Sequence, residues 1–255
     1  ESSIRGYPTQ MIRITELNNI VTLTLNRAGK HNALSAEMIG AIHVGLDEIE
    51  QNADMRVLIL AGEGRSFCAG MDLKGVLDNP PAMGEMLRGL AKASLRIRSL
   101  QVPTIARVQG AAVGGGCGLM VVCDFAFTHP ESKVGYPEVD LGVCPAVVAP
   151  WLIKKIGAGK ARAMLLAGGT ISGKQGFEAG LATHLYALDD LPSAVMHFAK
   201  NLAKGGKNAI STTKHWLNEL DGSLNEAMLQ KGADLSAKII ADDEAQERLR
   251  QIYAK

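Results

Sequence analysis

The sequence has few cysteines and few aromatic residues, no excess of charge and no long hydrophobic run. Its 255 residues include four cysteines, none of which forms a C-x-x-C pair or lies near a histidine at zinc-ligand spacing. This pattern argues against both a disulfide framework and a zinc site, so we expect no metal. It predicts buried free thiols in a reducing compartment, and we expect a cytoplasmic protein.

The charges of the chain are balanced. There are 27 basic and 26 acidic residues, which gives a formal net charge of +1. We therefore expect no nucleic acid and no membrane surface as a partner. No run reaches the roughly 18 apolar residues of a membrane-spanning helix, and no signal peptide is visible. What remains is a globular protein with a sizeable core.

The sequence does contain strand patterns that alternate with helix patterns. Alternating apolar runs at 11–17 and 20–25, separated by two asparagines, predict a hairpin. Ser35 is placed to cap the helix that follows, and the apolar run at 57–61 predicts a strand buried on both faces. This alternation favours an α/β fold. Further strands are expected at 104–108, 125–128 and 181–188, and helices at 36–52, 86–100, 151–156, 161–167 and 172–179.

From residue 193 onward the patterns are helical only. The change divides the chain into an α/β core, residues 1–192, and a helical region, residues 193–255. A helical tail of this kind packs either on a neighbouring subunit or back on its own core, and the sequence leaves both open.

A glycine triplet, Gly114 to Gly116, lies between the strand at 104–108 and an apolar helix at 117–123. A helix start offers free N–H groups and the positive end of the dipole, which suit a developing oxyanion or a phosphate. A tight strand-to-helix turn explains the triplet equally well. A second candidate N–H group is that of Met71, which follows a loop that ends in glycine. If the N–H groups of Met71 and Gly115 converge, they make an oxyanion hole.

Two acidic residues follow the triplet. Glu138 lies among apolar neighbours, where a raised pKa would suit it to act as an acid or a base, although a solvated loop carboxylate is the alternative. Asp140 has the same ambiguity. Lys74, Lys30 and Arg27 lie near these loops and would suit the phosphates of a nucleotide-bearing substrate, or are ordinary surface charges.

Together these segments resemble the crotonase family, the enoyl-CoA hydratases and isomerases. The matching segments occur in the order and spacing of the family, and they cover residues 10 to 190 well and the tail loosely. They are NALS at 32–35, FCAGMDLK at 67–74, PTIA at 103–106, the glycine-rich stretch at 110–119, CD at 123–124, and PE at 137–138 with LG at 141–142.

The resemblance implies a crotonase-type spiral of ββα turns, followed by a C-terminal helical region that builds homotrimers, often paired into hexamers. It implies an acyl-CoA substrate whose thioester oxygen lies between the N–H groups of Met71 and Gly115. Coenzyme A then belongs to the substrate, and no separate cofactor is expected. Residues matching positions near the coenzyme are Arg27, Lys30, Ala69 and Lys74.

The chain departs from the two-glutamate hydratases of this family at one catalytic position. Those enzymes carry a glutamate where this chain has Gly118, whereas the second glutamate is present as Glu138. A glycine cannot hold or deprotonate water, so hydration by two carboxylates is not available in its usual form. The segment at 144–150, CPAVVAP, also replaces the usual glycine-rich sequence.

Two enzyme activities and one binding role follow from this pattern. The combination of the Gly118 and Glu138 segments is similar to hydratases that act on branched, carboxylated enoyl-CoAs such as methylglutaconyl-CoA, and we favour hydration. Glu138 would orient water and exchange the C2 proton, with Asp140 or a substrate carboxylate as the additional acid or base. The alternatives are a Δ3,Δ2-enoyl-CoA isomerase that uses Glu138 alone, and an acyl-CoA-binding protein without catalysis.

Overall fold

The computed structural model describes residues 3–5 and 10–253. Its main sheet has seven strands in the order β1-β2-β3-β4-β5-β7-β10. The first three strands pair antiparallel, and the pairs from β3 to β10 are parallel. The strands are β1 (Ser3–Arg5), β2 (Ile12–Leu17), β3 (Ile20–Leu25), β4 (Val57–Gly62), β5 (Thr104–Val108), β7 (Phe125–Thr128) and β10 (His184–Leu185).

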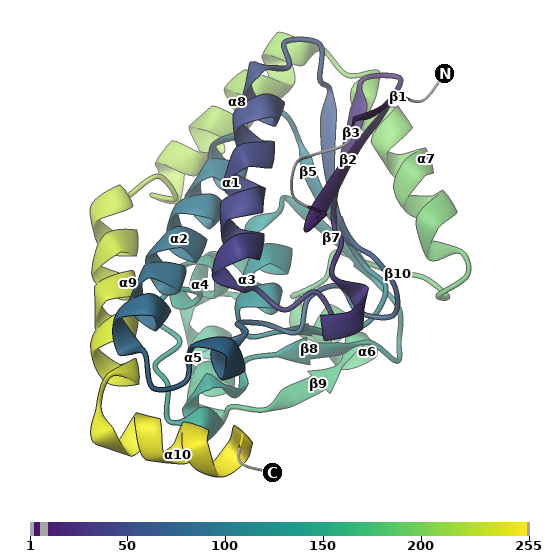
Figure 1. Ribbon diagram of the computed structural model, residues 1–255. Helices are drawn as coiled ribbons and strands as arrows, with labels where there is room; N and C mark the ends of the chain where they lie inside the picture. The colour runs from purple at the N-terminus through teal and green to yellow at the C-terminus, as the bar shows by residue number, and fades with distance from the viewer. Residues whose placement is uncertain (1–2, 6–9, 254–255) are drawn as a thin grey trace.

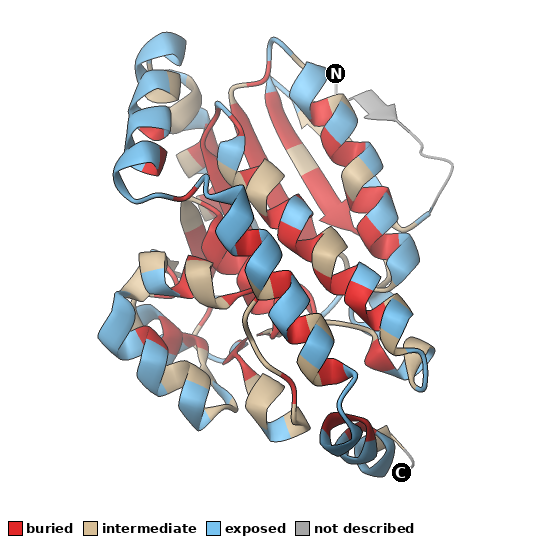
Figure 2. Cartoon of the chain, turned by 90° about the vertical axis from the view of Figure 1, so that its left-hand side faces the viewer, coloured by how far each residue is buried: buried red, intermediate tan, exposed pale blue. Residues whose placement is uncertain are grey.

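Helices cover both faces of this sheet (Figure 1). On one face lie α1 (Ala36–Gln51), α2 (Pro80–Ser99) and the short buried helix α3 (Gly115–Val122). On the other face α7 (Leu191–Ala203) packs its apolar side chains against those of β3, β4, β5 and β7. Figure 2 shows α1 and α2 with buried residues toward the sheet and exposed residues toward solvent. This two-sided cover explains why β4 is buried along its whole length.

A second, small sheet lies beyond the end of the main sheet. Its strands are β6 (Ala112–Val113), β8 (Lys133–Gly135) and β9 (Thr170–Ser172), with β8 paired to both others. The remaining helical elements of the core are η1 (Ala28–Lys30), η2 (Leu73–Val76), η3 (Pro137–Leu141), α4 (Ala149–Ile156), α5 (Ala158–Ala167) and α6 (Gly173–Ala179). The α/β class and the crotonase-type spiral expected from the sequence are confirmed.

The hairpin and the first helix form as predicted. Asn18 and Asn19 both have positive φ values, 53° and 61°, which is the conformation of a two-residue turn between twisted strands. The Ser35 side chain accepts a hydrogen bond from the N–H of Met38 and caps α1. Here local chemistry alone determines the structure.

Two predicted elements differ most from their observed bounds. Helix α2 begins at Pro80, six residues before the predicted start, because proline is tolerated in the first helical turn and Asn79 accepts from the N–H of Ala82 as the cap. The predicted strand at 181–188 shrinks to β10, which has two residues. There the apolar pattern comes from burial of Leu181 and Ala182 next to α6, and not from a strand.

The C-terminal helices of the described chain fold back on its own core. After α7 come α8 (Lys207–Leu220), α9 (Glu226–Ile240), which lies along α2, and α10 (Asp243–Tyr253), which lies against η3. Helix α7 begins at Leu191 and packs in the smaller apolar cluster on the other face of the main sheet, so the helical region is continuous with the α/β part. This arrangement is one of the two that the sequence left open.

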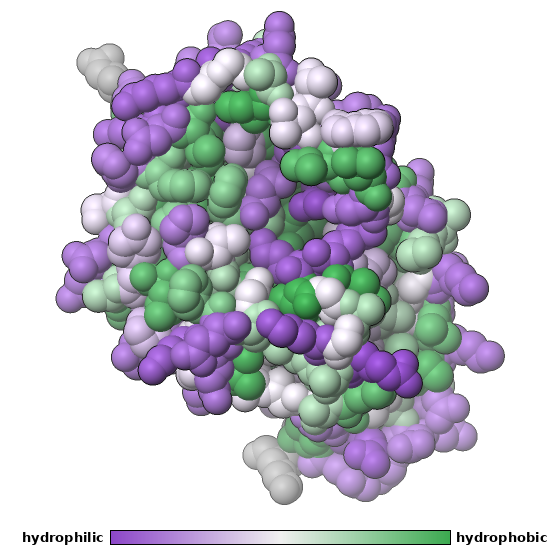
Figure 3. All heavy atoms as spheres, turned by 180° about the vertical axis from the view of Figure 1, so that it is seen from behind, coloured by the Kyte–Doolittle hydropathy of each residue, from purple (hydrophilic) through white to green (hydrophobic). Residues whose placement is uncertain are grey.

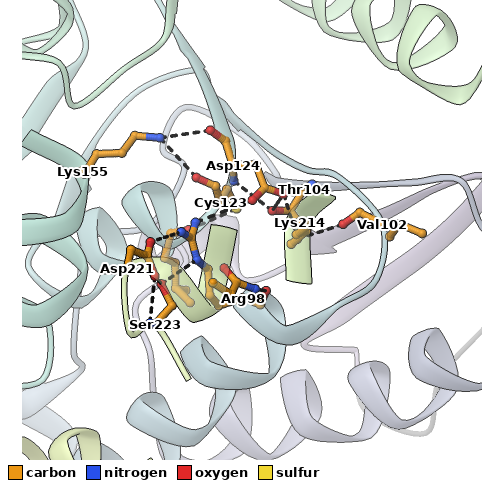
Figure 4. A network of polar contacts seen from close by, with 11 residues as sticks. Arg98, Val102, Thr104, Cys123, Asp124, Lys155, Lys214, Asp221 and Ser223 are labelled. Carbon is orange, nitrogen blue, oxygen red and sulfur yellow. Dashed lines mark hydrogen bonds and ion pairs between the residues drawn. The ribbon is translucent and has the colours of Figure 1, made fainter. Parts of the chain in front are cut away.

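A polar network joins α8 to the sheet (Figure 4). Asp124, just before β7, accepts from the backbone N–H and the hydroxyl of Thr104 and from Nζ of Lys214, at 2.8, 3.0 and 2.8 Å. Arg98, near the end of α2, lies 3.6 Å from the same carboxylate. Lys155 of α4 donates to the carbonyl of Asp124. One residue therefore connects two strands and three helices, and two of these helices are reached through its carboxylate.

The outer surface of α8 is apolar in part. Trp216, Leu217 and Leu220 are 56%, 54% and 63% exposed. Seen from behind, hydrophobic residues lie in separate groups among hydrophilic ones (Figure 3). The predicted trimer or hexamer stays a prediction. No helix within the described residues is long and apolar enough to cross a membrane.

Candidate active site

Two loops that are 44 residues apart in sequence are paired side by side. Cys68 and Ala112 form an isolated parallel bridge, in which the N–H of Val113 donates to the carbonyl of Cys68 at 3.0 Å. Each loop then continues three residues, to Met71 in one and to Gly115 in the other. The equal offset from the bridge brings these two residues to the same place.

The N–H groups of both residues are left without an acceptor in the part of the chain that the structure describes. Gly115 is the first residue of α3, so its N–H has no partner in the helix. Met71 lies opposite Leu34 in a bridge whose hydrogen bonds use Gly70 and Asp72 instead. A Cβ atom on Gly115 would lie 3.8 Å from Cγ of Met71. The two candidate oxyanion donors are therefore neighbours.

Both residues line one cavity of about 100 Å³. Its walls are mostly apolar and come from the two loops, from α2, from the segment after η3, and from the C-terminal helices. The C-terminal part of the wall was not anticipated from the sequence: it consists of Ser236 and Ile240 of α9 and Tyr253 of α10. The amphipathic patterns of these helices do not indicate that their side chains reach a site, because the position of the helices depends on packing between distant parts of the chain.

Glu138 also lines this cavity, on η3. Its Oε1 lies 3.1 Å from the position of a Cβ atom on Gly114, directly before the donor at Gly115. Its Oε2 is buried and has no hydrogen-bond partner among the described residues. Burial raises the pKa of Glu138 from 4.5 to about 7. Near neutral pH this carboxyl group can therefore take up and release a proton, as general acid–base catalysis requires.

Another side chain fills the space that a second carboxylate, at position 118, would need. A Cβ atom on Gly118 would lie 2.6 Å from Cγ1 of Val148, closer than real Cβ contacts. Val148 is 3% exposed and lines the cavity. A carboxylate at position 118 would not fit unless Val148 moved. The glycine and the valine thus belong together, and the valine comes from the segment where the sequence also departs from the family pattern.

The model of the family described as enoyl-CoA hydratase/isomerase matches residues 15–254. The chain belongs to this family. Its relatives include the short-chain-enoyl-CoA hydratase of Clostridium acetobutylicum, 27% identical over 214 residues, which are 80% of this chain and 82% of that protein. Another is the 2,3-dehydroadipyl-CoA hydratase of Escherichia coli, 25% identical over 243 residues, which are 95% of both chains.

Solved structures agree with this assignment. The crystal structure of an enoyl-CoA hydratase from Mycobacterium avium has a TM-score of 0.84 and 26% sequence identity, and covers 97% of this chain and 98% of its own. The crotonase resemblance of the motifs is thereby confirmed, and the protein is an enzyme of the crotonase family.

In this crotonase-family enzyme Asp140 does not join Glu138. Its Oδ2 accepts from the N–H of Gly169 at 2.8 Å, and the residue is exposed and absent from the cavity wall. Two residues apart in a 3₁₀ helix, the side chains of Glu138 and Asp140 point in different directions. The expectation that Asp140 supplies an additional acid is therefore not supported by its position. The prediction rested on the closeness of Asp140 to Glu138 in sequence. In the structure Asp140 instead accepts a hydrogen bond from the glycine turn before β9.

Of the four residues expected near the coenzyme, Ala69 lines the cavity, and Lys74 directly follows Leu73, which also lines it. Lys30 and Lys74 are exposed and make no ion pair within the described residues, and Ala69 is exposed on the cavity rim. Arg27 differs, because its Nη1 lies 2.6 Å from Oδ2 of Asp72. Contact of these four residues with coenzyme A stays a prediction, and the ion pair of Arg27 adds a link between two of the loops.

The cysteines are free thiols, as expected. Cys68, Cys117 and Cys123 are buried, and burial raises the pKa of each to about 12, so none is a reactive thiolate. Cys144 is half-buried and lines the cavity. Within residues 3–5 and 10–253 no group of three His, Cys, Asp or Glu side chains is placed to hold a metal ion.

Proposed function

We propose that this protein is an enoyl-CoA hydratase that adds water across the C2–C3 double bond of a 2-enoyl-CoA, with Glu138 as its single acid and base. The observation that carries the proposal is the unpartnered carboxyl group of Glu138, with a pKa of about 7, in the cavity that holds two free N–H groups. Names of relatives that are hydratases support the reaction type.

In the proposed mechanism the N–H groups of Met71 and Gly115 donate to the thioester oxygen. As the oxygen of water bonds to C3, the electrons of the double bond move toward that thioester oxygen and give an enolate, which the two donors stabilise. The Glu138 carboxylate takes the proton of the attacking water and then delivers it to C2. Water is consumed, the carboxylate is regenerated, and no second carboxylate is needed.

We further propose that the acyl group is uncharged. No Lys, Arg or His lines the cavity among the described residues. A carboxylated acyl group, such as methylglutaconyl, would bring a second negative charge into an apolar site beside Glu138 without a cationic partner. We therefore expect kcat/KM for crotonyl-CoA to exceed that for 3-methylglutaconyl-CoA at pH 8, where Glu138 is ionised. The reverse order, measured with the same enzyme, would contradict this part.

A Δ3,Δ2-enoyl-CoA isomerase is the second candidate, and one observation favours it. Val148 fills the space at Gly118, and among the described residues no second carboxylate lines the cavity to hold water. In that reaction Glu138 removes a proton from C2 of a 3-enoyl-CoA, the oxyanion hole stabilises the dienolate, and the proton returns at C4.

Product analysis distinguishes the candidates. The protein is incubated separately with 2-enoyl-CoA and 3-enoyl-CoA, and the products are identified by mass spectrometry and chromatography. A product heavier by one water from the 2-enoyl-CoA, without prior migration of the double bond, supports hydration. Isomerisation without added water establishes the second candidate and refutes the first. Binding of acyl-CoA without either product would assign the chain the non-catalytic role.

A further inference from the structure

The chain between β4 and Cys68 forms a loop whose carbonyl groups are held by a side chain from elsewhere. Nδ2 of Asn32 donates to the carbonyl oxygens of Glu63, Ser66 and Phe67, at 3.0, 2.8 and 3.2 Å. Asn32 is fully buried, and its Oδ1 accepts from the N–H of Arg27 at 2.8 Å. A positive φ of 56° aims the residue inward, a conformation that asparagine tolerates better than most residues.

A second amide holds the same loop from the other side. Nε2 of Gln109 donates to the carbonyl oxygens of Gly62, Gly64 and Ser66, at 2.7, 3.1 and 3.0 Å. Gln109 directly follows β5 and lies six residues before Gly115. The carbonyl oxygen of Ser66 therefore accepts hydrogen bonds from both amides. Together the side chains of Asn32 and Gln109 donate to five carbonyl groups of this short loop.

The backbones also approach closely here. A Cβ atom on Gly110 would lie 1.8 Å from the carbonyl oxygen of Arg65, so only glycine fits at this position. Beyond this contact the two chains run side by side to the bridge between Cys68 and Ala112, and then to the donors Met71 and Gly115. The separation of the two donors thus depends on how the loop at 62–67 lies against residues 109–110.

We propose that Asn32 and Gln109 are positioning residues for the oxyanion hole. They fix the loop that leads to Met71 against the segment that leads to Gly115, and in this way set the distance between the two N–H groups. The inference rests on the proposed enolate chemistry of this site. Without the amide donors the loop carbonyls lose their partners and seek water, which shifts the loop. A shift of about 1 Å in such a site lowers the rate about 10²-fold.

Gln109→Leu removes the donors at similar size, whereas Gln109→Lys keeps N–H groups within reach of the same carbonyls. Gln51→Leu, at an exposed position in α1, is the matched control. Each variant is mixed with acetoacetyl-CoA, and the near-ultraviolet absorbance of the bound enolate is measured. The dissociation constant of coenzyme A and kcat for crotonyl-CoA are measured separately for the same variants. The enolate readout reports the oxyanion hole without turnover, so it stands even if the proposed hydration fails.

We expect Gln109→Leu to lower the bound enolate fraction and kcat about 10²-fold, while the dissociation constant of coenzyme A changes less than about threefold. Gln109→Lys should restore most of both, and Gln51→Leu should leave them unchanged. If Gln109→Leu does not fold, Gln109→Met, which also lacks donors, is used with the same readouts. Enolate absorbance and kcat at wild-type levels in a folded donorless variant would overturn the proposal, as would an equal loss of coenzyme A affinity.

Discussion

Two carboxylates inside this fold have opposite environments. Asp124 has donors on all sides: the N–H and hydroxyl of Thr104, the ammonium of Lys214 and the guanidinium of Arg98 (Figure 4). Glu138 has a buried oxygen with no donor at all among the described residues. Asp124 joins elements through hydrogen bonds and ion pairs, whereas the pKa of Glu138 is raised to about 7.

The difference between these environments separates a carboxylate that stabilises the fold from one that lies in the candidate active site. Burial lowers the pKa of the Lys214 ammonium, and the carboxylate of Asp124, 2.8 Å away, opposes that shift. Among the described residues no Lys, Arg or His lines the cavity beside Glu138, and the apolar walls penalise its charged form. A buried carboxylate without a partner destabilises the folded state, and in the proposed mechanism this same group moves the proton.

The largest expected effect is on catalysis. Glu138→Gln should lower kcat for the proposed hydration about 10³-fold, because the amide cannot exchange the proton. The melting temperature should stay the same or rise, since a neutral amide replaces a carboxylate that burial disfavours. Steady-state kinetics and thermal denaturation check both parts. Asp140→Asn, at an exposed carboxylate outside the cavity, is the control and should keep its kcat within about threefold.

For substitutions of Asp124 we expect the reverse, a loss of stability with little change in kcat. Asp124→Ala should lower the free energy of unfolding by about 3 kcal/mol, because Lys214 and Arg98 lose the carboxylate that they share. Asp124→Asn keeps acceptors for Thr104 and should lose less. Urea denaturation measures the stability of both variants, and kcat below the transition should stay close to that of the wild type. A large loss of kcat in a stable Asp124→Ala variant would break the comparison.

The pH dependence of stability should show the same contrast. The folded pKa of Glu138 is raised from 4.5 to about 7, so between these values the folded state binds more protons than the unfolded state. Stability therefore falls as pH rises through this window, by about 3 kcal/mol at most, and is level above it. The loss should be absent in Glu138→Gln. Urea denaturation at pH 5 and pH 8 gives the change in unfolding free energy for each protein. An equal change in the wild type and in Glu138→Gln would count against the raised pKa.

The same group should control the pH dependence of the rate. The attacking water needs an ionised Glu138, so kcat/KM should rise with pH through about 7 and then level off. A bell-shaped profile in this range would indicate a second titrating group that the cavity does not show.

The smallest expected effect concerns the contact between Gly118 and Val148. Gly118→Ala should destabilise the protein by about 1–3 kcal/mol, because the added Cβ atom would press on Val148. Val148→Ala in the same chain should recover part of that loss by making room. A double-mutant cycle of unfolding free energies measures the coupling, and strict additivity would show that the two residues do not share this space.

The sequence predicted those parts of the site that local chemistry or a motif determines. Glycine spacing and the crotonase motifs identified Met71, Gly115 and Glu138, and the structure places all three on one cavity. The missing carboxylate at Gly118 was visible as a departure, but its replacement by Val148 was not, because that contact joins α3 to a loop 30 residues away.

Long-range packing explains the other misses. Asp140 shares a motif with Glu138, yet the turn of η3 directs it to the N–H of Gly169. The side chains of Ser236, Ile240 and Tyr253 reach the cavity because α9 lies along α2 and α10 lies against η3. No local pattern carries that information. The start of α2 was missed for another reason, since Pro80 can either break a helix or begin one.

The most direct test of the single-carboxylate site is the exchange of the C2 proton. A 3-hydroxyacyl-CoA is incubated in deuterated water with wild-type enzyme, Glu138→Gln or Asp140→Asn, and deuterium incorporation at C2 is followed by mass spectrometry. We predict rapid incorporation by the wild type and Asp140→Asn, and a rate about 10³-fold lower with Glu138→Gln. Exchange by Glu138→Gln at the wild-type rate would show that another group moves the proton, and would contradict the role assigned to this buried carboxylate.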